Sequence, residues 1–178
     1  MRAVLVAVVI AVLLALPAAA AEIDPKALVL DNRDVPAGFR LDRDESGIRS
    51  NAAEAKNDPR LPTLFRRWGR LTGYQVEYDR GKAKIQSRVD VCRRPAGARQ
   101  LLDWYDGEVR KLGFGGLRRA PARIGNQGWV YRVELPTAAT IVAWRHGRVF
   151  AGVMGQGVTR QRTIALARAQ QRRIAAAG

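Results

Sequence analysis

The sequence predicts an α+β fold, an antiparallel β-sheet of about five to six strands flanked by helices, behind an amino-terminal signal peptide. Short runs of alternating apolar and polar residues are joined by tight turns, two longer stretches have helical spacing, and the chain opens with an apolar leader. Strands joined by tight turns run antiparallel, and amphipathic helices bury their apolar stripes on a sheet. We expect both long helices to cover the same apolar side of the sheet.

The leader comprises residues 1–21, "MRAVLVAVVIAVLLALPAAAA". A positive charge at Arg2, an apolar run over 3–16 and small residues after Pro17 are typical of a secretory signal peptide. The apolar run is shorter than the roughly 20 residues of a spanning helix. We therefore expect cleavage, a single α+β domain over 22–178, a secreted or extracytoplasmic location and no transmembrane helix after cleavage. Retention of the leader as a membrane anchor is the alternative.

The first part of this domain is predicted to be mainly irregular. Asp24 and Pro25 form an N-cap and first-turn pair, so a short helix should start there and turn Leu28 and Leu30 inward. Residues 39–57 are polar without a sustained period, which predicts a surface loop or a weak helix.

Regular elements follow. Residues 61–68 can form one or two helical turns before Gly69. Alternation over 74–91 predicts a hairpin with one wet face, because a turn interrupts it at 79–82. Pro95 then starts a helix whose apolar residues recur at helical intervals up to Leu112, and Gly113 ends it.

The last part of the chain is predicted as three strands and a helix. Trp129, Tyr131, Val133 and Leu135 share one face of the first strand, with Arg132 and Glu134 on the other face. Two more runs, "TIVAWR" and "VFAGVMG", are joined through His146 and Gly147 by a connection of hairpin length. Thr159 can cap a final helix that turns Ile164, Ala167 and Ile174 inward.

Charge is the strongest signal for function. The chain has 31 Lys+Arg against 16 Asp+Glu, a net charge of +15, which attracts anions. Lysines are few and arginines many, so the bias of a GC-rich genome is one explanation, and an anionic partner outside the cell is the other. Export and the lack of a zinc-finger, helix-turn-helix or RNP-type pattern argue against nucleic acid. The candidate anion-binding residues are the outward arginines of the last helix and those of the basic connector before the last three strands: Arg162, Arg168, Arg172, Arg173, Arg118, Arg119 and Arg123.

No catalytic, cofactor or metal site is predicted. His146 lies between Arg145 and Arg148, which would disfavour its protonation, and it can take a positive-φ position in the turn. Asp103 and Asp106 lie three residues apart on a helix, where Arg99 and Arg110 offer ion pairs.

The single cysteine and the tryptophans also leave alternatives open. Cys92 is either a buried apolar residue or an exposed thiol able to bridge chains. Burial is favoured because free cysteines are commonly buried, although the alternation places Cys92 with Arg88 and Asp90 and so weakens this interpretation unless the strand ends first. The four tryptophans fill the core or line a sugar or lipid pocket.

Three segments carry a resemblance to known proteins: "DVPAGF", "SRVDVCRRPAGARQLLDW" and "VAWRHGRVFAGVMGQG" before an arginine- and glutamine-rich helix. In this pattern the chain resembles small exported or lipid-anchored proteins of GC-rich Gram-positive bacteria whose folds are similar to the PsbP and Mog1 group. The resemblance implies an antiparallel sheet flanked by helices and an accessory or sensory role at the envelope. It implies no functional residue, and the anchoring cysteine of the lipid-anchored members is missing here.

The leading hypothesis is a non-enzymatic exported domain at the cell envelope, whose partner is an anionic polymer, a membrane surface or an envelope protein. One alternative is a hydrolase that uses Asp103, Asp106 or Glu134, which would require a pocket that encloses them. The other is a structural or oligomerising module.

Overall fold

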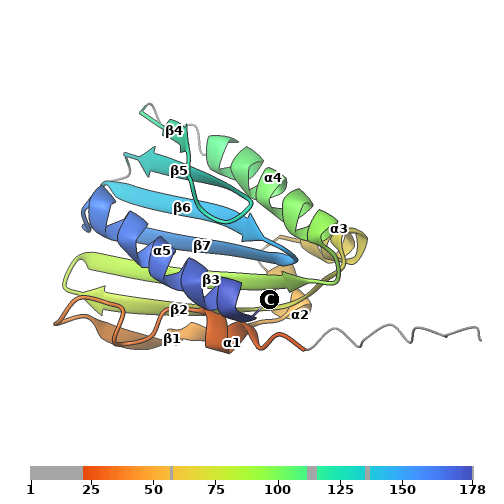
Figure 1. Ribbon diagram of the computed structural model, residues 1–178, viewed down its shortest axis with the longest axis horizontal. Coiled ribbons are helices and arrows are strands. Elements are labelled where there is room, and N and C mark those ends of the chain that lie inside the picture. Colours follow the sequence, from red (N-terminus) through yellow and green to blue (C-terminus); the bar gives the residue numbers. More distant parts are fainter. Residues whose placement is uncertain (1–21, 57, 112–115, 135–136, 178) are drawn as a thin grey trace, which may run out of the picture.

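A single antiparallel sheet organises the molecule. The structure, a computed structural model, describes residues 22–56, 58–111, 116–134 and 137–177; the predicted signal peptide, Gly113 and Leu135 lie outside these residues. The sheet has seven strands in the order β1-β2-β3-β7-β6-β5-β4 (Figure 1). The strands are β1 Arg40–Arg49, β2 Arg70–Arg80, β3 Ala83–Cys92, β4 Arg118–Pro121, β5 Gln127–Val133, β6 Ala139–His146 and β7 Val149–Gln156.

The strand count exceeds the predicted five to six because both edge strands escape pattern recognition. Strand β1 lies in the stretch 39–57, which was expected to be irregular; its pairing with β2 shifts register between Asp42 and Gly47, so the alternation is broken. Strand β4 has four residues, all of them exposed. Neither strand has a regular apolar face, and that is the signal on which prediction from periodicity depends.

The helices lie where the sequence predicts them. They are α1 Pro25–Leu28, α2 Asn51–Ala55, α3 Leu61–Trp68, α4 Pro95–Lys111 and α5 Arg160–Ala177. Asp24 caps α1 through its side chain, which accepts a hydrogen bond from Lys26 N, and Leu28 and Leu30 are buried as expected. The Thr159 hydroxyl accepts a hydrogen bond from Arg162 N at the start of α5. In the described part of the chain, no helix combines the length and the apolar character needed to cross a membrane.

The two long helices cover opposite faces of the sheet, which corrects the expectation that both lie on one side (Figure 1). On one face α1 and α5 pack on residues such as Val89, Val142 and Trp144. On the other face α3 and α4 pack on residues such as Tyr131 and Phe150. The central strands are therefore covered by helices on both faces. The face of the β2–β3 hairpin that is predicted to be wet is covered only in part, since Asp90 is buried whereas the Lys84 side chain is 41% exposed.

Cys92 shows the consequence of this arrangement. It lies on the same side of β3 as Arg88 and Asp90, yet it is fully buried because α3 and α4 cover that side. Burial raises the pKa of its thiol to about 12, and the nearby Asp90 adds to the shift. The buried interpretation of this residue is confirmed, and the exposed-thiol alternative is wrong.

Polar residues on the same side of β3 are accommodated by a buried ion network. The guanidinium of Arg70 donates from Nε and Nη2 to Asp90 Oδ1, at 2.8 and 2.5 Å, and also bonds Asn51 and the carbonyl of Arg49. Arg88 donates to the same carboxylate from the same strand. In "SRVDV", alternate residues therefore face opposite sides of the sheet. Val89 and Val91 pack in an apolar core, whereas Arg88 and Asp90 lie in a buried network of paired charges.

Candidate anion-binding site

The edge strand β4, its neighbour β5 and helix α5 together place three cationic side chains around one pocket. Arg118 is the cross-strand partner of Arg132, and Ala120 is the partner of Val130. Side chains on a strand alternate between the faces, so Arg132 lies on the same face as Val130, which packs in the core beneath α5. Arg118 and Arg132 are both exposed.

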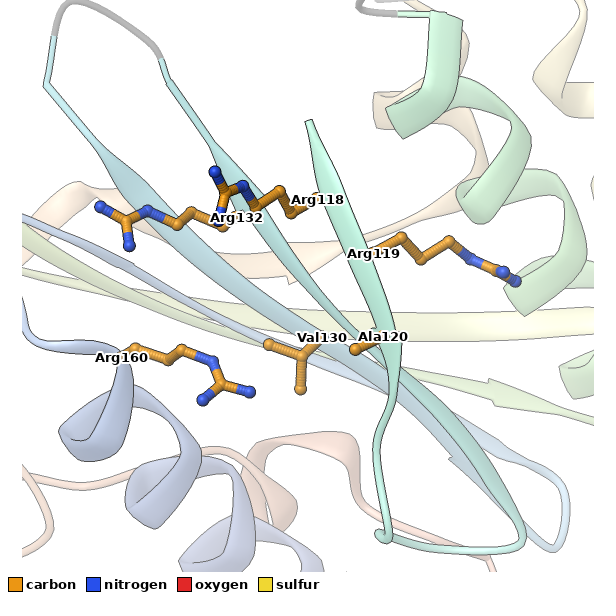
Figure 2. A pocket seen from close by; sticks show the side chains of 6 residues that line it. All are labelled: Arg118, Arg119, Ala120, Val130, Arg132 and Arg160. Carbon is orange, nitrogen blue, oxygen red and sulfur yellow. The ribbon is translucent and has the colours of Figure 1, made fainter. Parts of the chain in front are cut away.

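Helix α5 supplies the third arginine. Arg160 is the first residue of this 18-residue helix and lies next to the capping residue Thr159. The helix amino terminus carries a partial positive charge that favours anions. Figure 2 shows Arg118, Arg132 and Arg160 around Val130 on the α5 side of the sheet. The pocket they line has a volume of about 270 Å³, and Ala120 and Val130 form its apolar part.

Three of the four arginines that border this pocket have no carboxylate partner among the residues that the structure describes. Within the described ranges, no carboxylate forms an ion pair with Arg118, Arg132 or Arg160, whereas Arg70, Arg88 and Arg173 each have one. Like charges directly opposite each other on paired strands destabilise the pairing. Guanidinium groups bind phosphate and carboxylate through two parallel hydrogen bonds, so an anion in this pocket would relieve the repulsion.

The candidate arginines predicted from the sequence do not form one surface. Arg118 lies in the pocket; Arg119 also borders it, but its side chain extends away from the other three arginines, toward α4 (Figure 2). There its Nε donates to Asp106 Oδ1 at 2.6 Å, and its guanidinium lies 3.3 Å from the ring centroid of Trp129. Arg123 is exposed in the loop after β4 and does not line this pocket.

The arginines predicted on the last helix also divide into two groups. Arg162, Arg168 and Arg172 are exposed on α5, as expected. Arg173 instead forms ion pairs with Asp31 at 2.8 Å and Asp34 at 2.7 Å, so its charge is used to hold the segment after α1.

Sequence reasoning missed Arg132 and Arg160 as site residues. The signals that could have found them are a cap residue directly before Arg160 and the outward position of Arg132 on its strand.

The three carboxylates of the hydrolase alternative have different environments. Asp106 is buried, and its carboxylate accepts hydrogen bonds from Arg119 Nε, from Tyr131 Oη at 2.8 Å and from Arg110 Nη2 at 2.5 Å. The Arg110 pair is the one predicted from their spacing. Asp103 is exposed on the same helix, and Glu134 follows β5 and is also exposed.

Tyr131 shares the buried setting of Asp106. Burial raises the pKa of Tyr131, and its hydrogen bond to Asp106 raises it further. The phenol therefore remains a hydrogen-bond donor at neutral pH, and the Asp106 cluster ties α4, β4 and β5 together.

His146 is the last residue of β6 and not a turn residue. The two residues between β6 and β7 are Gly147 and Arg148, and Gly147 takes the positive φ of +52°. The predicted hairpin is present, but its turn is shifted by one residue. Nδ1 of His146 lies 3.1 Å from Nε2 of Gln171 on α5, so the ring contacts the helix.

One group of carboxylates has spacing suited to a cation. Oxygens of Asp42, Glu77 and Asp79 lie within 4.8 Å of one another on β1 and β2. The ammonium of Lys84 lies 2.5 Å from Glu77 and 3.5 Å from Asp79, so a lysine of the chain already provides the positive charge there.

Comparison with known proteins defines the class of fold and does not place the chain in a family. The chain is an α+β domain whose antiparallel sheet has helices on both faces. The extracellular domain of PknH from Mycobacterium tuberculosis has a similar fold, with a TM-score of 0.51 and 12% sequence identity over 83% of this chain and 94% of that domain. No protein-family model and no curated protein matches the sequence. The resemblance to the PsbP and Mog1 group therefore remains a prediction.

Proposed function

We propose that this chain is an exported, non-enzymatic domain that binds a phosphate-bearing partner at the cell envelope. The observation that carries the proposal is the convergence of Arg118, Arg132 and Arg160 on one pocket, without an ion-paired carboxylate in the part of the chain that the structure describes. The apolar leader supports export. The similarity in fold to the extracellular domain of PknH agrees with a location outside the cytoplasm.

Phosphate is the anion that this arrangement suits best. A phosphate monoester or diester has at least two anionic or carbonyl-like oxygens arranged around a tetrahedral centre, so it can accept hydrogen bonds from guanidinium groups that approach from three directions, whereas the two oxygens of a carboxylate lie in one plane. The amino terminus of α5 adds a further favourable field. Outside a cell, phosphate groups occur in wall polymers and in anionic lipid headgroups, so the two sources share one recognition chemistry.

A binding role is supported over catalysis by the placement of the reactive residues. Asp106 is buried and its carboxylate is held by three hydrogen-bond donors, whereas Asp103 is exposed to solvent. His146 contacts Gln171.

Sedimentation with vesicles tests the proposal and separates the pocket from general surface charge. The test pair is Arg132→Gln with Arg160→Gln, and the matched control pair is Arg168→Gln with Arg172→Gln, which removes the same charge from exposed positions of α5. Vesicles containing phosphatidylglycerol are compared with pure phosphatidylcholine vesicles and with a soluble phosphodiester wall polymer.

We expect the test pair to weaken binding about tenfold or more, because each lost charge-assisted hydrogen bond contributes about 1.5–3 kcal/mol. The control pair should have a small effect that disappears at high salt, where exposed charges are screened. Equal losses for both pairs, or no preference for the anionic phosphatidylglycerol vesicles or the polymer over the zwitterionic phosphatidylcholine vesicles, would show that the pocket is not the binding site.

A further inference from the structure

A second pocket lies on the opposite side of the sheet from the three arginines. Its volume is about 280 Å³, and it is formed by α3 and α4 over β3, β6 and β7, with Glu54 of α2 at its side. Pockets that bind small molecules start at about 300 Å³ and combine apolar walls with a few polar groups. This pocket has that composition and is large enough for one small ring.

Aromatic side chains form much of its wall and are held in place by one another. Trp104 packs against Trp68 with ring centroids 6.0 Å apart, and Tyr105 packs against Phe150 at 5.5 Å. Trp104 and Tyr105 are partly exposed, and both line the pocket. Fixed aromatic rings offer flat apolar surfaces at little entropic cost on binding.

The polar groups of this pocket have hydrogen-bonding capacity that the described part of the chain leaves unused. Arg88 donates from Nε and Nη2 to Asp90, and Nη2 also lies 3.2 Å from Glu54 Oε2. Among the described residues, Arg88 Nη1, Glu54 Oε1 and the Tyr105 hydroxyl have no hydrogen-bond partner. The Glu54 side chain is only 10% exposed. Such groups in a half-enclosed site need partners from water or a ligand.

The charges around the pocket cancel, which distinguishes it from the rest of this basic chain. Asp90 is bound by Arg70 and Arg88, Glu54 by Arg88, and Glu108 by Lys111 at 2.8 Å. An anion would be repelled by these carboxylates, and a cation would compete with the arginines. A neutral ligand that both donates and accepts hydrogen bonds fits the available groups.

We propose that this pocket binds a neutral hydroxylated ring of the size of a single sugar unit. The apolar face of such a ring would lie against Trp104 or Tyr105, while its hydroxyls donate to Glu54 and accept from Arg88. The site is separate from the arginine pocket, so this inference does not depend on the proposed phosphate binding.

Saturation-transfer NMR of the full chain with neutral monosaccharides tests this inference. Glucose, galactose, mannose, arabinose and N-acetylglucosamine serve as probes, and glucuronate and glucosamine serve as charged analogues. The test variants are Tyr105→Phe, which removes only a hydroxyl, and Glu54→Gln. Arg132→Gln, on the opposite face, is the control, and circular dichroism verifies that each variant folds.

We expect saturable binding of at least one neutral sugar, weakened about two- to tenfold by each test variant, since each removes or weakens one hydrogen bond. Arg132→Gln should leave the affinity unchanged. The inference is overturned if no neutral sugar binds the wild type at millimolar concentration, if both folded test variants bind as the wild type does, or if only a charged analogue binds.

Discussion

Arg118 and Arg132 face each other across the β4–β5 pair, and within the described ranges neither forms an ion pair with a carboxylate. Two like charges in directly opposite positions weaken strand pairing. Close by, on the opposite face of the β4–β5 edge, Asp106 forms ion pairs with both Arg110 and Arg119. Arg110 and Arg119 are therefore ion-paired on that face, whereas Arg118 and Arg132 have no such partner among the described residues. The face that carries Arg118 and Arg132 is the one we assign to anion binding.

Removal of one of these charges should stabilise the protein while it weakens binding. We predict that Arg132→Gln raises the free energy of unfolding by a few tenths of a kcal/mol in phosphate-free buffer. Added phosphate should raise the melting temperature of the wild type, because a ligand that binds only the folded state stabilises it. The phosphate effect should be much smaller in Arg132→Gln than in Arg168→Gln. A variant less stable than the wild type, with an unchanged response to phosphate, would contradict the prediction.

The buried pair of Arg70 and Asp90 should be essential for folding. Both side chains are at most 1% exposed, and the two partners lie 2.5 Å apart. Asp90→Asn would leave the buried guanidinium without its counter-charge, so we expect a loss of about 3–5 kcal/mol in urea denaturation. The exposed Asp103→Asn is the control and should change stability by less than about 0.5 kcal/mol. Similar losses for the two variants would mean that the pair contributes little.

The same carboxylate gives the protein sensitivity to acid. Burial alone would raise the pKa of Asp90, but the guanidinium groups of Arg88 and Arg70 outweigh burial and hold its pKa below the usual value. The resulting stabilisation is present above the unfolded-state pKa of about 4 and is lost as the pH falls through the folded-state value. The free energy of unfolding should therefore decrease below about pH 4, and this decrease should be smaller in Asp90→Asn. Parallel pH profiles for the two proteins would show that other groups are responsible.

Cys92 should be chemically inert in the folded protein. Its thiol is fully buried and its pKa is raised to about 12, so the reactive thiolate is scarce at neutral pH. We expect no labelling by iodoacetamide under native conditions and complete labelling in denaturant, measured by mass spectrometry. Formation of a disulfide-linked dimer by the native protein would be the opposite result.

Tyr78 should make the protein sensitive to alkali. Its hydroxyl donates to the carbonyl of Leu30 at 3.1 Å, and burial raises its pKa to about 12. The neutral phenol is thus favoured in the folded state, which adds stability that is complete below about pH 10 and lost as the pH rises toward 12. Urea denaturation at a series of alkaline pH values should show a shallower decline for Tyr78→Phe than for the wild type. Identical slopes would mean that folding does not raise the pKa of Tyr78.

The elements that could be predicted from the sequence are those specified by residues close together in the chain, such as helix caps and alternating strand residues. The caps at Asp24 and Thr159 and the β2–β3 alternation were sufficient to place α1, α5 and the hairpin. Local signals could not predict that helices cover both faces of the sheet. Arg88 and Asp90 have the pattern of a solvent-exposed face, although α3 and α4 cover them. Their charges are satisfied by Arg70 and Glu54 from other elements, a pairing that depends on tertiary contacts.

The candidate site was predicted only in part for the same reason. Arg118 was found because it lies in a basic run, but its partners Arg132 and Arg160 come from β5 and from the start of α5. Arg119 and Arg173 could not be excluded from sequence because Asp106 and Asp31 are distant along the chain. Net charge suggested an anionic ligand, and the fold indicates which arginines are available for the site that we propose.

The most direct test of the central claim is an NMR titration of the arginine Nε–Hε signals with inorganic phosphate. The three-arginine pocket predicts saturable shifts of the signals of Arg118, Arg132 and Arg160 with one common affinity, and little change at the exposed Arg162, Arg168 and Arg172. Small, non-saturating shifts spread evenly over all exposed arginines would contradict the account, because they would show that phosphate recognises only the overall charge.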